Sequence, residues 1–179
     1  MNNNVMTDIP VQTKTVLSLL PPYPIVLVST RTNIITINQI EYFTFSPLRI
    51  GIAVAHVRYT YERLKEEQAF VVNVPGAHLV DEVKLCGSIS GRDGDKFERA
   101  GLTPQSFEDG DLTDFPAVGI AECGAQIACR VEREIVFEHR TWFVGPVVAA
   151  RSRPDHTGTT ALMCGREAYS LPGETVSPR

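Results

Sequence analysis

The sequence lacks three features that would each indicate a particular class of protein: a long apolar run, a basic cluster and a basic leader. No apolar stretch approaches the roughly 20 residues needed to cross a bilayer, and the first ten residues hold no Lys or Arg. The net charge is -4, the pI is about 5.6, and no run of Lys or Arg occurs. We therefore expect no nucleic-acid partner, no membrane association and a cytoplasmic location.

Metal-ligand patterns are also missing. The four cysteines form no C-x-x-C pair, and the four histidines show no H-E-x-x-H or other metal-ligand spacing. A zinc site is therefore not expected. We interpret the cysteines as reduced, small buried hydrophobic residues, and they are Cys86, Cys123, Cys129 and Cys164.

The length and the hydrophobic content of the sequence suit one packed domain. A length of 179 residues with 43% hydrophobic content is enough for a single core. Residues 1–20 are predicted to be a loosely held lead-in, because the prolines at 21, 22 and 24 fix the backbone and remove donors at its end. The domain is therefore predicted to cover residues 21–179.

The hydrophobic pattern predicts a mainly β protein with short helices. β-branched runs separated by turn residues indicate strands, and period-two alternation indicates a half-buried strand. About six to eight strands in a domain of this size favour a closed or partly closed antiparallel barrel. The predicted strands cover residues 25–30, 33–38, 50–55, 70–74, 126–132 and 142–151.

Two helices and one irregular strand complete this prediction. Thr60 is placed as the N-cap of a helix over residues 61–67. Leu79, Val83 and Cys86 share one face of a second helix, at spacings of four and three. A sheet tolerates Pro only at an edge or bulge, so the last strand is expected to break or bend at Gly145-Pro146.

Three segments carry a resemblance to a known family. They are T-N-I-I-T-I-N at residues 32–38, R-Y-T-Y at 58–61 and S-G-R-D-G-D-K-F at 90–97. In this order and spacing they resemble the flavin reductase-like branch of the FMN-binding split-barrel proteins, the flavoredoxin-like group. The resemblance covers about residues 22–173. It implies a split β-barrel, usually a homodimer with FMN near the subunit boundary.

The segment at 58–61 is the candidate phosphate site. A dianionic phosphate needs clustered N–H donors, a hydroxyl and a cation, which a helix start supplies when Thr60 follows Arg58. An ordinary Thr N-cap is the alternative from the residues alone. The match to the family favours phosphate binding.

The segment at 32–38 is the candidate site for the flavin ring. The resemblance assigns flavin contacts to Asn33, Thr36 and Asn38, although Asn33 also suits a turn after Thr32. Related proteins commonly carry a Trp six residues after this Asn, where the present chain has Gln39. The loss of an aromatic wall is expected to weaken flavin binding or to reshape the pocket for another ligand.

Further candidates come from the rest of the resemblance. Lys96 matches a family Lys that favours the anionic reduced flavin or meets the phosphate. Arg92 is expected to order its loop by pairing with Asp93 or Asp95, with a contact across the dimer as the alternative. His139 matches a flavin-proximal His, with an exposed hairpin His as the alternative. Tyr169 matches an aromatic segment that covers the cofactor, with core packing as the alternative.

These features predict an NAD(P)H-dependent flavin oxidoreductase. Hydride transfer to flavin requires stacking rather than a protein acid or base, so no catalytic residue is named. The chain has no G-x-G-x-x-G fingerprint, and the nicotinamide is expected to dock transiently as a substrate. An electron-carrier flavoprotein and a flavin-free split barrel with another ligand stay open as alternatives.

Overall fold

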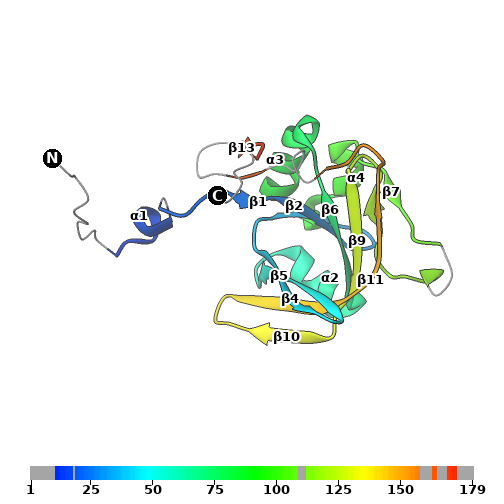
Figure 1. Cartoon of the computed structure of the whole chain (residues 1–179), viewed down its shortest axis with the longest axis horizontal. Coiled ribbons are helices and arrows are strands. Elements are labelled where there is room, and N and C mark those ends of the chain that lie inside the picture. The colour runs from blue at the N-terminus through cyan, green and yellow to red at the C-terminus, as the bar shows by residue number, and fades with distance from the viewer. Residues whose placement is uncertain (1–10, 18, 109–111, 158–162, 165–168, 173–179) are drawn as a thin grey trace, which may run out of the picture.

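A strongly curled antiparallel sheet forms the body of the protein (Figure 1). The computed structural model describes residues 11–17, 19–108, 112–157, 163–164 and 169–172. The sheet has the strand order β3-β2-β6-β9-β11-β5-β4, and β10 pairs with β11. Its strands are β2 (Val26–Ser29), β3 (Ile34–Ile37), β4 (Ile40–Phe45), β5 (Leu48–Ala55), β6 (Ala69–Val74), β9 (Ala125–Arg130), β10 (Arg133–Val136) and β11 (Arg140–Ser152).

Short strand pairs and helices surround this sheet. Five two-residue strands form two small sheets, β1-β12-β13 and β7-β8. The elements are β1 (Tyr23–Pro24), β7 (Pro104–Gln105), β8 (Gly119–Ile120), β12 (Met163–Cys164), β13 (Tyr169–Ser170), α1 (Thr13–Leu17), α2 (Tyr59–Glu67), α3 (Val80–Ser88), α4 (Lys96–Ala100) and the 3-10 turns η1 (Ala77–Leu79) and η2 (Gly91–Asp93). This confirms the prediction of a mainly β protein with short helices.

The core lies on both sides of β2 and β3. Inside the curl, side chains such as Val28, Ile52 and Phe143 pack together, and Leu64 of α2 closes this cluster. On the other side, Leu27 and Ile34 pack against α3 and α4. Alternation along a strand sends neighbouring residues to opposite faces, which explains why both faces of this pair are apolar. Burial of the thiols at 86, 123 and 129 confirms the interpretation of these cysteines.

The long strand β11 bends near Gly145-Pro146, which is one of the two outcomes predicted there (Figure 1). The strand does not break at Gly145-Pro146: it pairs with β5 through Pro146 and with β9 from Val147 onward, and a register irregularity lies between Val147 and Ala149. In Figure 1, β11 runs beside β10 and then turns upward beside β9. The change of partner strand tolerates Pro because it falls where the ladder is interrupted.

The start of α2 also differs from the prediction. Arg58 is the N-cap, in extended conformation, and no side chain caps the helix there. Thr60 is therefore the second helical residue, and it is buried. Its hydroxyl points inward instead of capping its own helix, which leaves the amides of the first turn without a side-chain acceptor.

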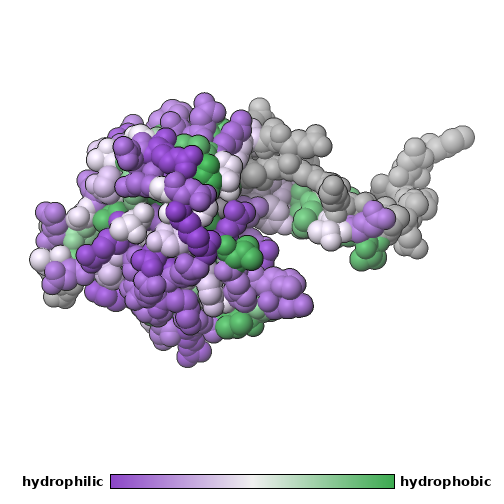
Figure 2. Space-filling model, turned by 180° about the vertical axis from the view of Figure 1, so that it is seen from behind, coloured by the Kyte–Doolittle hydropathy of each residue, from purple (hydrophilic) through white to green (hydrophobic). Residues whose placement is uncertain are grey.

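The segment ahead of β1 lies on the surface. Figure 1 shows α1 projecting from the body, and Figure 2 shows hydrophobic residues in this segment, while the body face in that view is largely hydrophilic. Among the described residues, no helix is long and apolar enough to cross a membrane. In the same part of the chain, no group of His, Cys, Asp or Glu residues is arranged to hold a metal ion.

Candidate functional site

A pocket of about 180 Å³ lies where β3, α2, α3 and η2 meet. Four of the predicted site residues line it: Asn33, Arg58, Thr60 and Lys96. They come from three segments that are far apart in the sequence, and antiparallel pairing of β2 with β3 brings the first of them beside the start of α2. The fold therefore gathers the residues that the resemblance associated with phosphate and flavin.

The pocket is cationic. Arg58, Arg92 and Lys96 line it, and no Asp or Glu is among the lining residues. Arg92 donates to Glu62 of α2 and to the carbonyl oxygen of Val57, at 3.3 Å. The predicted pairing of Arg92 with Asp93 or Asp95 is therefore wrong.

Local capping explains why Asp95 does not pair with Arg92. Its carboxylate accepts hydrogen bonds from the backbone amides of Phe97, at 2.7 Å, and Glu98, so that it caps α4. An aspartate that ends an extended segment before a short helix is satisfied locally in this way. Arg92 is left to reach across the loop to α2.

Lys96 is a buried cation at the inner wall of the pocket. Only 3% of its surface is exposed, and its Nζ donates to the carbonyl oxygens of Ile34 and Cys86, each at 2.8 Å. Burial lowers the pKa of Lys96 from its ordinary value, and the nearby charge of Arg58 lowers it further. Burial likewise raises the pKa of the Cys86 thiol to about 11. A ligand anion would supply the opposite charge that Lys96 lacks here.

Asn33 and Thr60 form a buried pair at the base of the pocket. Each side chain is 1% exposed, and Asn33 Nδ2 donates to Thr60 Oγ1 at 2.7 Å. The other end of the amide, Asn33 Oδ1, is buried and has no hydrogen-bond partner among the described residues. Buried polar atoms without partners are rare in folded proteins, so this oxygen marks a place where a ligand donor fits.

Thr36 and Tyr169 lie at a different surface. Both line an open depression beside α3. Thr36 Oγ1 donates to the carbonyl oxygen of Val83 at 2.5 Å, and Lys84 Nζ lies 6.0 Å from the centre of the Tyr169 ring. Thr36 and Tyr169 therefore lie near each other, but neither lines the cationic pocket. Their proposed roles in flavin binding stay predictions.

The remaining predicted residues are exposed. Asn38 and Gln39 follow β3, and the Gln39 side chain accepts a hydrogen bond from Arg140. His139 is at the tip of the β10-β11 hairpin, where its side chain is 82% exposed and 3.6 Å from Glu138. None of these three residues lines the cationic pocket, and their proposed contacts with flavin also stay predictions.

Sequence reasoning did not single out several residues of the pocket. Tyr59 lies between two guanidinium groups, with Arg63 Cζ 5.1 Å and Arg92 Cζ 5.5 Å from its ring centre. Gly91 lies so close to Asn33 that an added Cβ would overlap Asn33 Oδ1. Both belong to segments that carried the resemblance, but adjacency across the chain is needed to see their contacts.

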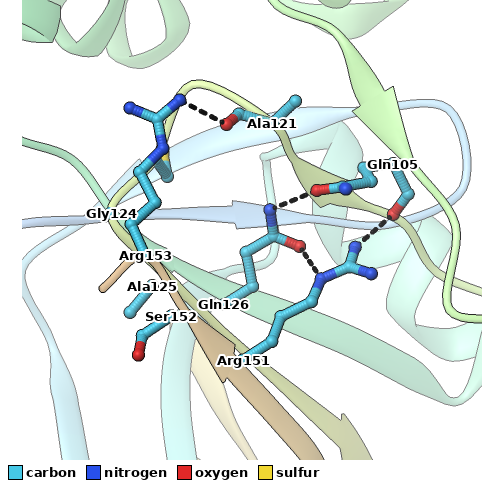
Figure 3. Close-up of a pocket in the computed structure, with 9 residues that line it drawn as sticks. Gln105, Ala121, Gly124, Ala125, Gln126, Arg151, Ser152 and Arg153 are labelled. Carbon is cyan, nitrogen blue, oxygen red and sulfur yellow. Dashed lines mark hydrogen bonds between the residues drawn. The ribbon is translucent and has the colours of Figure 1, made fainter. Parts of the chain in front are cut away.

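A second pocket, of about 200 Å³, has a structural explanation (Figure 3). Arg151 donates to the Gln126 side chain and to the carbonyl oxygens of Gln105 and Ser106. Gln126 in turn donates to the Gln105 side chain and to Ile120 O. These groups are satisfied by one another and attach the β7 segment to the sheet, in contrast to the unpartnered oxygen of Asn33.

Comparison of the sequence with known proteins supports the resemblance described above. The model of the "Flavin reductase like domain" family matches residues 18–172. A protein of Archaeoglobus fulgidus is 34% identical over 118 residues, which is 66% of this chain and 64% of that protein. A protein of Pyrococcus abyssi is 26% identical over 122 residues, 65% of this chain and 64% of that protein. The chain thus matches 64% of the length of each of these curated relatives.

Solved structures share the fold. Flavoredoxin from Methanosarcina acetivorans has a TM-score of 0.81 at 22% identity, over 97% of this chain and 95% of that chain. Nitrilotriacetate monooxygenase component B from Bacillus cereus has a TM-score of 0.82 at 18% identity, over 98% and 100%. A flavin reductase of Shewanella frigidimarina, described as having a split barrel domain, has a TM-score of 0.80 at 14% identity, over 94% and 93%. The curled sheet is therefore the split-barrel fold.

Proposed function

The chain belongs to the flavin reductase like domain family, a family of flavin-related oxidoreductases, and from this premise we propose that it binds FMN with the phosphate in the cationic pocket. We further propose that it is an NAD(P)H-dependent flavin reductase and acts as a homodimer. The observation that carries the proposal is a pocket lined by three cations, of which Arg92 alone has an acidic partner, and by a buried acceptor that has no partner among the described residues.

The residues present fit a phosphate group. Arg58 supplies a guanidinium donor, Thr60 supplies a hydroxyl, and the first turn of the nine-residue helix α2 has no side-chain cap, whereas Arg92 is already paired with Glu62. The Tyr61 amide already donates to Arg58 O at 2.9 Å, so the turn offers an anion the amides of Tyr59 and Thr60 and the positive end of the helix dipole. The volume of about 180 Å³ is below the roughly 300 Å³ at which small-molecule pockets begin, so it suits one end of a cofactor.

The rest of the cofactor would extend out of the pocket. FMN, when bound, supplies the hydride acceptor. The chain's own contribution is to hold the phosphate, to orient the ring and to leave one ring face open for a nicotinamide to stack. In the proposed homodimer the ring lies near the boundary, where Asn38, Gln39 and His139 of this chain are exposed and accessible to it.

Comparing two flavins tests the phosphate site. Arg58→Ala with Thr60→Ala removes two contacts to the phosphate, each worth about 1.5 to 3 kcal/mol when charge-assisted, so FMN affinity should fall about 30-fold or more. Riboflavin, which has no phosphate, should lose far less. The matched control is Arg133→Ala with Thr103→Ala, an exposed Arg and an exposed Thr that do not line the pocket. Equal losses for both flavins in the pocket variant contradict the phosphate site.

Anaerobic stopped flow tests the reductase activity. NADH or NADPH should bleach the absorption band of bound flavin at a rate that saturates with nicotinamide, because stacking precedes hydride transfer. Dithionite provides the control for reducible flavin. If dithionite reduces the bound flavin and neither nicotinamide does, the protein is an electron carrier, and if the protein binds no flavin at all, the proposal fails.

A further inference from the structure

The two ends of the Asn33 amide meet different surroundings. Nδ2 donates to Thr60 Oγ1 at 2.7 Å, whereas Oδ1 is buried without a partner among the described residues. Gly91 packs against this oxygen, since a Cβ there would overlap Oδ1 and come 2.7 Å from a Tyr59 ring carbon. The amide is thus held between Gly91 and Thr60, and Asn33 is one of the residues that line the cationic pocket.

The bond from Asn33 has a consequence for Thr60. A hydroxyl has one hydrogen and two lone pairs. Because Thr60 Oγ1 accepts from Asn33, its own hydrogen remains to be donated, and within the described chain Thr60 Oγ1 donates to no acceptor. The hydroxyl therefore offers a donor where Arg58, Arg92 and Lys96 already favour an anion.

We propose that Asn33 selects the chemical class of the ligand, a phosphate monoester of a hydroxylated chain. Asn33 Nδ2 positions the Thr60 hydroxyl as a donor to a phosphate oxygen, and Asn33 Oδ1 accepts a hydrogen bond from a hydroxyl of the chain that carries the phosphate. This inference rests on the proposed function, in which the ligand is FMN and the hydroxyls are those of its ribityl chain. It places Asn33 where the ribityl chain of FMN meets the phosphate, and not beside the flavin ring.

The proposed contact to the ligand hydroxyl and the proposed contact to the phosphate should affect binding affinity separately. Three ligands distinguish them: FMN, riboflavin, and a flavin whose N10 chain is an unhydroxylated pentyl 5-phosphate. The wild-type protein should prefer FMN to the pentyl phosphate about 5-fold, the value of one net hydrogen bond, and to riboflavin by a larger factor. We call these ratios the hydroxyl preference and the phosphate preference.

Two substitutions at Asn33 should change the two preferences in different proportions. In Asn33→Asp the carboxylate accepts the Thr60 hydrogen and repels the phosphate, so the phosphate preference should fall about 10-fold or more while the hydroxyl preference remains. In Asn33→Leu the hydroxyl preference should disappear because Oδ1 is lost, and the phosphate preference should fall in part because Nδ2 no longer positions Thr60. Thr60→Val, in which Asn33 is retained, should lose phosphate preference alone and provides a second arm if a variant at Asn33 does not fold. Ser106→Asp adds the same charge at an exposed position that does not line the cationic pocket and should leave both ratios unchanged.

The affinities are measured by fluorescence titration, with thermal unfolding of each variant as the check of folding. Equal losses for all three ligands in both Asn33 variants, or a hydroxyl preference that survives Asn33→Leu, would overturn the inference. A wild-type protein that binds FMN without any hydroxyl preference also overturns it and leaves the proposed function standing. A wild-type protein that binds none of the three flavins instead contradicts the proposed function.

Discussion

The ammonium nitrogen of Lys96 lies 2.8 Å from the carbonyl oxygen of Cys86, in the last turn of α3. Its second hydrogen bond reaches Ile34 O at the start of β3. The last carbonyls of a helix have no partners within the helix, and a cation there is favoured by the helix dipole. Lys96 thus joins α3 to β3 beside the pocket, and no carboxylate of the described residues pairs with its charge.

Lys96→Met should reduce both stability and FMN affinity. The change leaves two buried carbonyls unpaired, which should lower the free energy of unfolding by about 1 to 3 kcal/mol, and it removes a pocket cation, which should weaken FMN about 10-fold or more. Urea unfolding and fluorescence titration measure the two effects. Lys84→Met, an exposed lysine of α3, is the control and should change stability by less than about 0.5 kcal/mol. Unchanged FMN affinity in Lys96→Met would place the phosphate away from Lys96.

Gly91→Ala and Gly101→Ala should separate pocket geometry from backbone strain. A Cβ at Gly91 displaces Asn33 and Tyr59, so this variant should lose FMN affinity and about 1 to 3 kcal/mol of stability. Gly101 has a φ of +63° and open space around its Cβ position, so its variant should lose about 1 to 2 kcal/mol through strain alone. Parallel thermal unfolding and FMN titration are the measurements. FMN affinity that falls equally in both variants would contradict the assignment of Gly91 to the pocket.

Much of the fold could be predicted from the sequence because β-branched runs and apolar alternation are local signals. The runs at 25–30 and 33–38 are the antiparallel pair β2 and β3, as expected. Pro146 indicated an irregularity at the right place, but the sequence could not show that β11 changes partner strands there, which no local pattern encodes. Thr60 was placed one residue outside its helix for a similar reason: its hydroxyl bonds to Asn33, 27 residues earlier, instead of to its own helix.

The site was predictable only in part. The resemblance named Asn33, Arg58, Thr60 and Lys96, which the fold gathers in one pocket. It could not show that Lys96 is buried, since a lysine in a polar segment is ordinarily solvated. It also could not find the partner of Arg92, because Glu62 lies on another element and becomes a neighbour only through the packing of α2 on η2.

Cys129 should make stability depend on pH above pH 9. Burial raises the pKa of Cys129 to about 12, from 9.0 in the unfolded chain. The folded state therefore keeps a proton that the unfolded state loses, so this contribution is complete below pH 9 and is lost as the pH rises toward 12, at about 1.4 kcal/mol per pH unit. Urea unfolding between about pH 8 and about pH 10 should show a smaller decline for Cys129→Ala than for wild type. If the free energy of unfolding declines equally in both proteins, Cys129 is not a source of the pH dependence.

The edge strand β4 is the expected site of dimer contact. Tyr42, Phe43 and Phe45 are exposed on it, Phe45 by 79%, and the Tyr42 and Phe45 rings lie 5.1 Å apart. Exposed apolar groups on an unpaired edge favour association with another chain. Phe45→Glu should shift the protein from dimer to monomer in sedimentation velocity. Leu19→Glu, on the projecting segment, is the control and should leave the dimer intact, and a wild-type protein that is already monomeric would refute the prediction.

Substitutions at Gln39 should show whether the flavin ring of bound FMN extends along β3, away from the phosphate pocket. In this chain the Gln39 side chain is exposed and accepts from Arg140, so it leaves open the place where the resemblance expects an aromatic wall. Gln39→Trp should tighten FMN by roughly 0.5 to 1.5 kcal/mol if the ring stacks there, and it should slow reduction by nicotinamide through a narrower entry. Gln39→Ala separates stacking from loss of the Arg140 contact and should not tighten binding. Titration of FMN into both variants gives the comparison, and a Trp variant that matches the Ala variant would place the ring elsewhere.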